Sequence, residues 1–293
     1  MSIEQKPSMK KANTNLLRFR WFTCNCMQFE LSNGKTIVLD PFLPSSDAEG
    51  WHFADHYCGY LPEDLGRVDY VLINHTHGDH VGSLPEVYDL FRPRILCHSA
   101  CAEALSMDLD IPQTSFFPFD GNGFYQFGDF GLQTIPARHN GTARPSERPS
   151  VTEEGRFAKL NRLGTLFNTN FVIETANHIR VGICAGVLRP NEAEKNSWEG
   201  MRCNIFIRQL GGYMIRNDPE GLASEFMQTG ASLLLPLHQE RFYEGKLSGD
   251  LNEMTEKVNE ILTAKGYAGC MLNPERGKWY TVNFGIWCEN EKK

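Results

Sequence analysis

The sequence predicts an α/β fold in which two β-sheets are covered by helices on their outer sides. Strand-like and helix-like stretches alternate through both halves of the 293 residues. No repeat or low-complexity tract interrupts them, and no linker separates two hydrophobic cores. We therefore predict a loosely attached arm over residues 1–16 and a single domain over residues 17–293.

The N-terminal half begins with a predicted hairpin. Residues 18–31 and 36–39 are strand-like, and the intervening Asn33-Gly34 pair is typical of a tight hairpin turn. Cys24 and Cys26 would share one face of the first strand, which is either a core face or the wall of a site, and the core is favoured. The pattern then predicts a short helix opened by Pro62, a strand at 68–73, a helix at 83–90, a strand at 95–96, a helix over 102–107 capped by Ser99, and strands at 114–118 and 123–135.

The C-terminal half contains two irregular stretches between regular elements. Residues 140–163 are polar and predict a long loop, and residues 187–202 predict a second one. The remaining elements are strands at 168–175, 179–185 and 204–208, a helix at 219–229, a strand at 232–237, a helix at 250–265 and a last strand near 279–287.

Composition restricts the class of protein. Hydrophobic residues make up 41% and charged residues 22%, which is ordinary for a globular protein. The net charge of −7 argues against a nucleic-acid or anionic-membrane partner. No apolar run approaches the roughly 18 residues of a membrane span, and the N-terminus lacks the apolar core of a signal peptide. We expect a cytoplasmic protein with a small-molecule substrate. The sequence is also compatible with a homo-oligomer.

Nine cysteines are scattered along the chain and form no Cys-x-x-Cys pair. Their odd number and the absence of an export signal favour reduced thiols rather than a disulfide framework. We expect most of them to behave as small buried hydrophobic residues.

The run from His75 to His80 (HTHGDH) is the most informative motif. It follows the apolar stretch Tyr70–Ile73, so a strand would deliver three imidazoles and the carboxylate of Asp79 to one loop. This set of ligands suits Zn, Mn or Fe, whereas Mg and Ca prefer all-oxygen shells. The motif predicts a metal site. His139 and His238 each follow another predicted strand and are placed to join it.

The stretch VDYVLINHTHGDHVGSL resembles the signature of the metallo-β-lactamase superfamily. Three further segments resemble the family's other motifs. They are IVLDPFLP with Asp40, TIPARHNGTARPSERP with His139, and LLLPLHQE with His238. The resemblance implies a four-layer αββα sandwich. The pattern PARH-x-x-x-x-R followed by LGTLFNTNFVIE looks most like the branch of ascorbate-phosphate lactonase and N-acylethanolamine phospholipase D.

The resemblance also implies one or two divalent transition-metal ions, with zinc favoured and manganese or iron as alternatives. One ion would be held by His75, His77 and His139. A second would be held by Asp79, His80 and His238, and Asp40 would brace the ligands from beneath.

One departure from the family concerns the second metal. The family usually carries a bridging Asp where this chain has Gly186 and Val187. A carboxylate there offsets the repulsion between two cations, so its loss should leave the second position weak, empty or completed by an unusual ligand. Three explanations remain open. The enzyme works with one metal, another residue such as Cys184 or Glu192 replaces the Asp, or hydrolytic activity has been lost.

These features predict a metal-dependent hydrolase that cleaves a small, anionic ester, lactone, amide or phosphodiester by means of a metal-bound hydroxide. Asp79 would orient the nucleophile and move a proton. Arg144 or Arg148, in the predicted loop, would reach the anionic group of the substrate. The alternative is a catalytically silent binding or sensing protein on the same scaffold. A di-iron oxygen-reducing protein would need a full bridging-carboxylate site and usually a flavin domain, which the chain does not offer.

Overall fold

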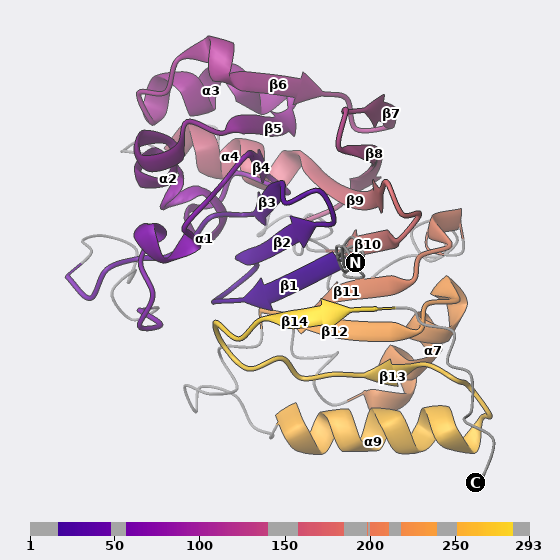
Figure 1. Ribbon diagram of the computed structural model, residues 1–293. Helices are drawn as coiled ribbons and strands as arrows, with labels where there is room; N and C mark the ends of the chain where they lie inside the picture. Colours follow the sequence, from indigo (N-terminus) through magenta and orange to yellow (C-terminus); the bar gives the residue numbers. More distant parts are fainter. Residues whose placement is uncertain are drawn as a thin grey trace, which may run out of the picture.

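The computed structural model describes residues 17–47, 57–139, 158–184, 198, 200–210, 218–238 and 251–283. These residues form two seven-stranded sheets that lie face to face, with helices outside each sheet (Figure 1). The four-layer αββα sandwich expected from the sequence is confirmed.

The first sheet has the strand order β14-β1-β2-β3-β4-β5-β6. Strands β3, β4, β5 and β6 run parallel to one another, whereas β14, β1 and β2 join the sheet by antiparallel pairing. The strands are β1 (Leu17–Trp21), β2 (Met27–Leu31), β3 (Thr36–Leu39), β4 (Tyr70–Leu72), β5 (Arg94–His98), β6 (Phe116–Phe119) and β14 (Tyr280–Val282).

The second sheet has the order β13-β12-β11-β10-β9-β8-β7, with β10 to β13 parallel and β7 to β10 antiparallel. Its strands are β7 (Gly123–Gln126), β8 (Phe130–Ala137), β9 (Asn168–Thr175), β10 (Arg180–Cys184), β11 (Ile205–Gln209), β12 (Leu233–Leu237) and β13 (Cys270–Met271). The described helices are η2 (Pro62–Leu65), α1 (Gly78–Val81), α2 (Leu84–Phe91), α3 (Ser99–Asp108), η3 (Gln113–Ser115), α4 (Ala158–Leu166), α7 (Pro219–Thr229) and α9 (Leu251–Ala264).

Three hydrophobic clusters separate the four layers. The alternation along β9 illustrates the principle, because Phe171 and Ile173 lie between the two sheets whereas Val172 faces the outer helices. Helices α2 and α3 cover the first sheet, and α7 and α9 cover the second (Figure 1). Strands buried on both faces need continuous apolar runs, which is why TIVL and LLLPL are strands despite lacking polar alternation.

Several strands that end in candidate ligands bring those residues to the same edge of the sandwich. Asp40 follows β3, and the segment from Asn74 to His77 follows β4. His139 follows β8, and His238 follows β12 directly. The fold therefore gathers side chains that are up to about 200 residues apart in the chain.

Three local predictions are corrected. Residues 18–31 are not one strand, because residues 22–26 turn between β1 and β2, with Cys26 N–H donating to the Thr23 carbonyl at 2.7 Å. Ser99 is not the cap of α3 but its first residue. The His98 imidazole takes the cap position and accepts the Ala100 N–H at 3.2 Å.

The third correction concerns the predicted loop 140–163. Its last six residues belong to α4, which begins at Ala158. Leu160 of α4 is fully buried against the first sheet and its helices. The helix was missed because its few apolar residues are interrupted by Asn161, Arg162 and Gly164, which mask the helical period.

No helix in the described ranges combines the length and the apolar character needed to cross a bilayer. The predicted arm over residues 1–16 lies outside the described residues. The eight described cysteines are all free thiols, and Cys288 lies outside those ranges.

Candidate metal centre

Three imidazoles meet where β4 and β8 end. The ring centroids of His75 and His77 are 4.7 Å apart, and His139 lies 4.4 Å from His77 and 5.0 Å from His75. One ring nitrogen from each of the three lies within 4.8 Å of the others. The spacing of two ligands around a tetrahedral ion with bonds of about 2.1 Å is about 3.4 Å, so a small adjustment of the rings would close this group around one ion.

His75 is held in a defined tautomer. The Asn74 side chain donates its NH₂ group to the Thr169 carbonyl, which turns its Oδ1 toward His75. That oxygen accepts the Nδ1–H of His75 at 2.7 Å. The Nε2 atom therefore carries a lone pair, yet it is buried and has no hydrogen-bond partner among the described residues. A buried acceptor without a partner is costly in a native protein, and a bound cation would satisfy it.

In His77 the nitrogen available to a metal is Nδ1, whereas in His75 it is Nε2. Its Nε2–H donates to the Asn161 carbonyl of α4 at 3.1 Å, and the Thr165 hydroxyl lies at the same distance. Because a carbonyl can only accept, Nδ1 is the atom with a free lone pair. Burial, together with the nearby His139, lowers the pKa of His77 to about 3. At neutral pH no proton has to leave this imidazole before a metal binds.

Asp79, His80 and His238 lie next to the three-histidine group. The Asp79 Oδ2 atom is 3.6 Å from His238 Nε2, and Oδ1 is 3.8 Å from His80 Nε2. Burial by itself would raise the pKa of Asp79, but the neighbouring His80 and His238 outweigh it and lower the pKa to about 2. These separations exceed hydrogen-bond length and match the spacing between ligands of one ion.

Asp40 lies beneath both groups and is completely buried. Its Oδ1 accepts the Asn74 backbone N–H at 2.7 Å, and its Oδ2 accepts the His80 Nδ1–H at 2.8 Å. Burial raises the pKa of Asp40, while the facing His80 opposes the rise. One carboxylate thus fixes the loop that carries His75 and also directs His80 Nε2 toward Asp79.

Cys24 is a neighbour that the sequence reasoning did not assign to the site. Its thiol sulfur, an Asp79 oxygen and a His238 nitrogen lie within 4.8 Å of one another. The expectation of a strand over 18–31 favoured the core for Cys24 over the wall of a site. The pair Thr23 and Asn25 was the available signal, because both residue types favour turns.

Three residues of this site have a strained backbone. Cys24, Asp40 and His238 adopt left-handed conformations with φ of 45°, 43° and 54°. Such conformations are uncommon for residues other than glycine and cost about 1 kcal/mol or more each. The surrounding structure holds them, which is typical of functional sites.

Gly164 of α4 packs directly against the metal-site loop. A Cβ atom at this position would lie 2.6 Å from His77 Cδ2 and 2.8 Å from the His77 backbone nitrogen. For Gly164→Ala we expect the loop to shift and zinc affinity to fall by roughly 10- to 100-fold, the range seen when the support of a ligand is disturbed. Competition with a chromogenic chelator measures this affinity.

Gly128→Ala is the matched control, because a Cβ there meets nothing within 4 Å. It should bind zinc as the unaltered protein does. Zinc affinity in Gly164→Ala equal to that of the control would show that α4 does not position His77.

Several predicted residues lie outside the described ranges. They are Arg144, Arg148, Gly186, Val187 and Glu192. Cys184, considered as a replacement for the bridging Asp, packs in the cluster between the second sheet and helices α7 and α9. It belongs to neither group of candidate ligands in the described part of the chain.

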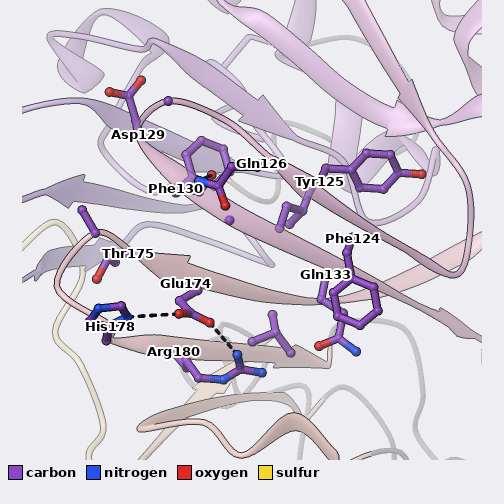
Figure 2. A pocket seen from close by; sticks show the side chains of 15 residues that line it. Phe124, Tyr125, Gln126, Asp129, Phe130, Gln133, Glu174, Thr175, His178 and Arg180 are labelled. Carbon is purple, nitrogen blue, oxygen red and sulfur yellow. Dashed lines mark hydrogen bonds and ion pairs between the residues drawn. The ribbon is translucent and has the colours of Figure 1, made fainter.

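A separate hollow of about 370 Å³ lies along β7, β8, β9 and β10. Figure 2 shows Glu174 between His178 and Arg180, with a hydrogen bond of 3.3 Å to His178 and an ion pair of 2.6 Å with Arg180. None of the six predicted metal ligands lines this hollow. It is therefore not part of the metal centre.

Comparison with known proteins supports the fold and the family. The chain is 24% identical over 112 residues to a metal-dependent hydrolase of Thermodesulfovibrio yellowstonii, covering 38% of this chain and 37% of the relative. It is 30% identical over 128 residues to a metal-dependent hydrolase of Bacillus cereus strain AH187, covering 42% and 48%. The chain therefore matches less than half the length of these relatives.

Two solved structures share the fold across most of the chain. A metallo hydrolase from Ignicoccus hospitalis superposes with a TM-score of 0.61 at 17% identity, covering 92% of this chain and 99% of that one. An isothiocyanate hydrolase from Delia radicum gut bacteria superposes with a TM-score of 0.62 at 16% identity, covering 91% and 99%. The family model of the metallo-beta-lactamase superfamily matches residues 19–175, more than half of the chain. The chain belongs to this superfamily.

Proposed function

We propose that this protein is a metal-dependent hydrolase whose primary metal is held by His75, His77 and His139. The observation that carries the proposal is the buried Nε2 atom of His75, which has no hydrogen-bond partner among the described residues and faces two further imidazoles. Neutral nitrogen ligands of this kind suit zinc, with manganese and iron as alternatives. A divalent cation there would supply Lewis-acid activation of a water molecule and of the bond to be cleaved.

The residues around the metal would bind and orient the reactants. Asp79 has a side chain that is 34% exposed, so its carboxylate can meet a substrate while it remains beside His80 and His238. We assign to it the orientation of the attacking water and the transfer of its proton. Asp40 would act through His80 and the Asn74 backbone rather than by touching substrate.

For the substrate class we propose a small anionic ester, lactone, amide or phosphodiester, as in the branch of ascorbate-phosphate lactonase and N-acylethanolamine phospholipase D. The support comes from the sequence, where Arg144 and Arg148 follow the strand that ends near His139. We further propose that the protein acts in the cytoplasm. The catalytically silent binding protein is the second candidate, favoured by Gly186 and Val187 in place of a carboxylate.

The test is to strip the metal with a chelator, reload samples with zinc, manganese or iron, and assay anionic and neutral members of the four substrate classes. We expect turnover of an anionic member of one class, its loss on chelation and its recovery with one of the metals. Turnover that resists chelation while the metal is shown to be absent would reject the proposal. A fully loaded protein that binds an anionic compound without cleaving it would favour the silent candidate.

A further inference from the structure

The turn between β1 and β2 carries a thiol into the metal centre. Residues 22–26 connect the two strands, and Cys24 is completely buried at the middle of this turn. Its sulfur lies within 4.8 Å of ligand atoms of both Asp79 and His238. These three residues come from β1–β2, from the start of α1 and from the end of β12, so only the folded chain assembles them.

The backbone of Cys24 is tied to one of these partners. The Cys24 carbonyl accepts the indole N–H of Trp21 and the backbone N–H of His238, each at 3.0 Å. Two donors on one oxygen stabilise the left-handed conformation of Cys24. This backbone hydrogen bond from His238 positions the thiol and the imidazole together.

Comparison with two other buried cysteines shows that Cys24 occupies a different environment. Cys26, two residues on, packs in the apolar cluster between the first sheet and its helices, and Cys184 packs in the cluster beyond the second sheet. Cys24 belongs to none of the three apolar clusters formed by the described residues. Its neighbours within ligand distance are a carboxylate and an imidazole.

Charge favours a cation at this point. The Asp79 carboxylate lies 3.6 Å from His238 Nε2, and a thiolate at Cys24 would add a second anionic ligand opposite a divalent ion. This is the charge that the chain lacks at Gly186 and Val187. When the ion binds, the thiol proton leaves to solvent and the sulfur–metal bond replaces the S–H bond.

We propose that Cys24, Asp79 and His238 form a second metal site in which the Cys24 thiolate supplies the anionic ligand that the chain lacks at Gly186 and Val187. His80, with Nε2 3.8 Å from Asp79 Oδ1, is the fourth candidate ligand. A thiolate is a soft ligand, so this site selects zinc and its substitutes cobalt and cadmium over manganese. This inference rests on one part of the proposed function, namely that a first metal binds to His75, His77 and His139.

The experiment uses cobalt(II) as the probe in the full chain. Metal-free protein is titrated with cobalt while its absorption is recorded, because sulfur-to-cobalt charge transfer gives a strong near-ultraviolet band that nitrogen and oxygen ligands do not give. We expect the band to develop with the second equivalent. X-ray absorption of the zinc-loaded protein should show a sulfur neighbour at about 2.3 Å.

Two variants at Cys24 and one matched control distinguish the loss of a metal ligand from a general disruption of the fold. Cys24→Ser should abolish the band, while the first equivalent of cobalt still binds. It should lower the affinity for the second equivalent by more than the roughly 100-fold seen when only a neighbour of a ligand is changed. Cys24→Asp keeps an anionic ligand and suits a left-handed backbone, so it should bind two equivalents without the band. Cys26→Ala, whose sulfur is in the core, should retain the band.

Each outcome decides the proposal. No band in the unaltered protein at two equivalents, or a band that survives in both Cys24 variants, would overturn it. Hydrolysis assays on the same samples keep the two proposals apart. A band that depends on Cys24 without turnover of any substrate rejects the hydrolase and supports the site. Turnover by protein that shows no band at two equivalents supports the hydrolase and rejects the site.

Discussion

Replacing His77 with alanine is expected to abolish tight metal binding and to lower kcat/KM by at least about 1000-fold. The metal supplies several kcal/mol of charge stabilisation, and each 1.4 kcal/mol corresponds to a factor of ten in rate. The fold should persist, because His77 lies outside the three apolar clusters and the Thr165 hydroxyl already donates to the Asn161 carbonyl that His77 releases. Metal analysis after gel filtration and steady-state kinetics measure the two effects.

His178→Ala is the matched control for this experiment. The His178 side chain is 87% exposed and pairs only weakly with Glu174 at 3.3 Å, in the hollow that is separate from the metal centre. Metal content and kinetics should remain unchanged. A His77→Ala protein that keeps one tight metal and its full activity would contradict the assignment of His77.

Replacing Asp40 with asparagine is expected to have the second-largest effect, on stability and metal affinity together. The fully buried carboxylate accepts hydrogen bonds from both the Asn74 backbone and His80. In asparagine one of the two accepting oxygens becomes a donor, which would face another donor. We expect the free energy of unfolding to fall by about 3 kcal/mol, as when one partner of a buried pair is removed.

The same change should weaken zinc binding by roughly 10- to 100-fold, because the loop carrying His75 and the orientation of His80 both depend on Asp40. Asp69→Asn is the control. Asp69 also accepts a backbone N–H, from Thr36 at 3.0 Å, but it lies at the start of β4 rather than at its end. The control should lose stability and keep its zinc affinity. An unchanged zinc affinity in Asp40→Asn would show that Asp40 has only a structural role.

The predictions from sequence were strongest where a strand ends in a polar residue. An apolar run that stops at Asp40, at Asn74 before His75, or at His238 indicates both a buried strand and a group delivered to its end. The structure brings these groups together because neighbouring parallel strands end at the same edge of the sheet. The layered fold followed from the same apolar runs.

The weaker predictions failed where tertiary contacts override local pattern. The stretch from Phe22 to Met27 alternates between apolar and polar residues and predicts a continuous strand. The chain nevertheless turns at Cys24, because hydrogen bonds from Trp21 and from His238, more than 200 residues away, hold that turn. Local sequence does not contain the second of these contacts. Helix α4 was not predicted for a similar reason. Gly164 has a low helix propensity, but its lack of a side chain leaves room for His77 to pack against the helix.

We propose that His75, His77 and His139 hold a metal ion through defined nitrogens. An X-ray structure of the zinc-loaded protein, with anomalous scattering recorded at the zinc edge, would locate this ion. We expect a zinc ion about 2.0 to 2.1 Å from His75 Nε2, His77 Nδ1 and a ring nitrogen of His139. Zinc bound elsewhere at full loading, with these three imidazoles free of metal, would contradict it.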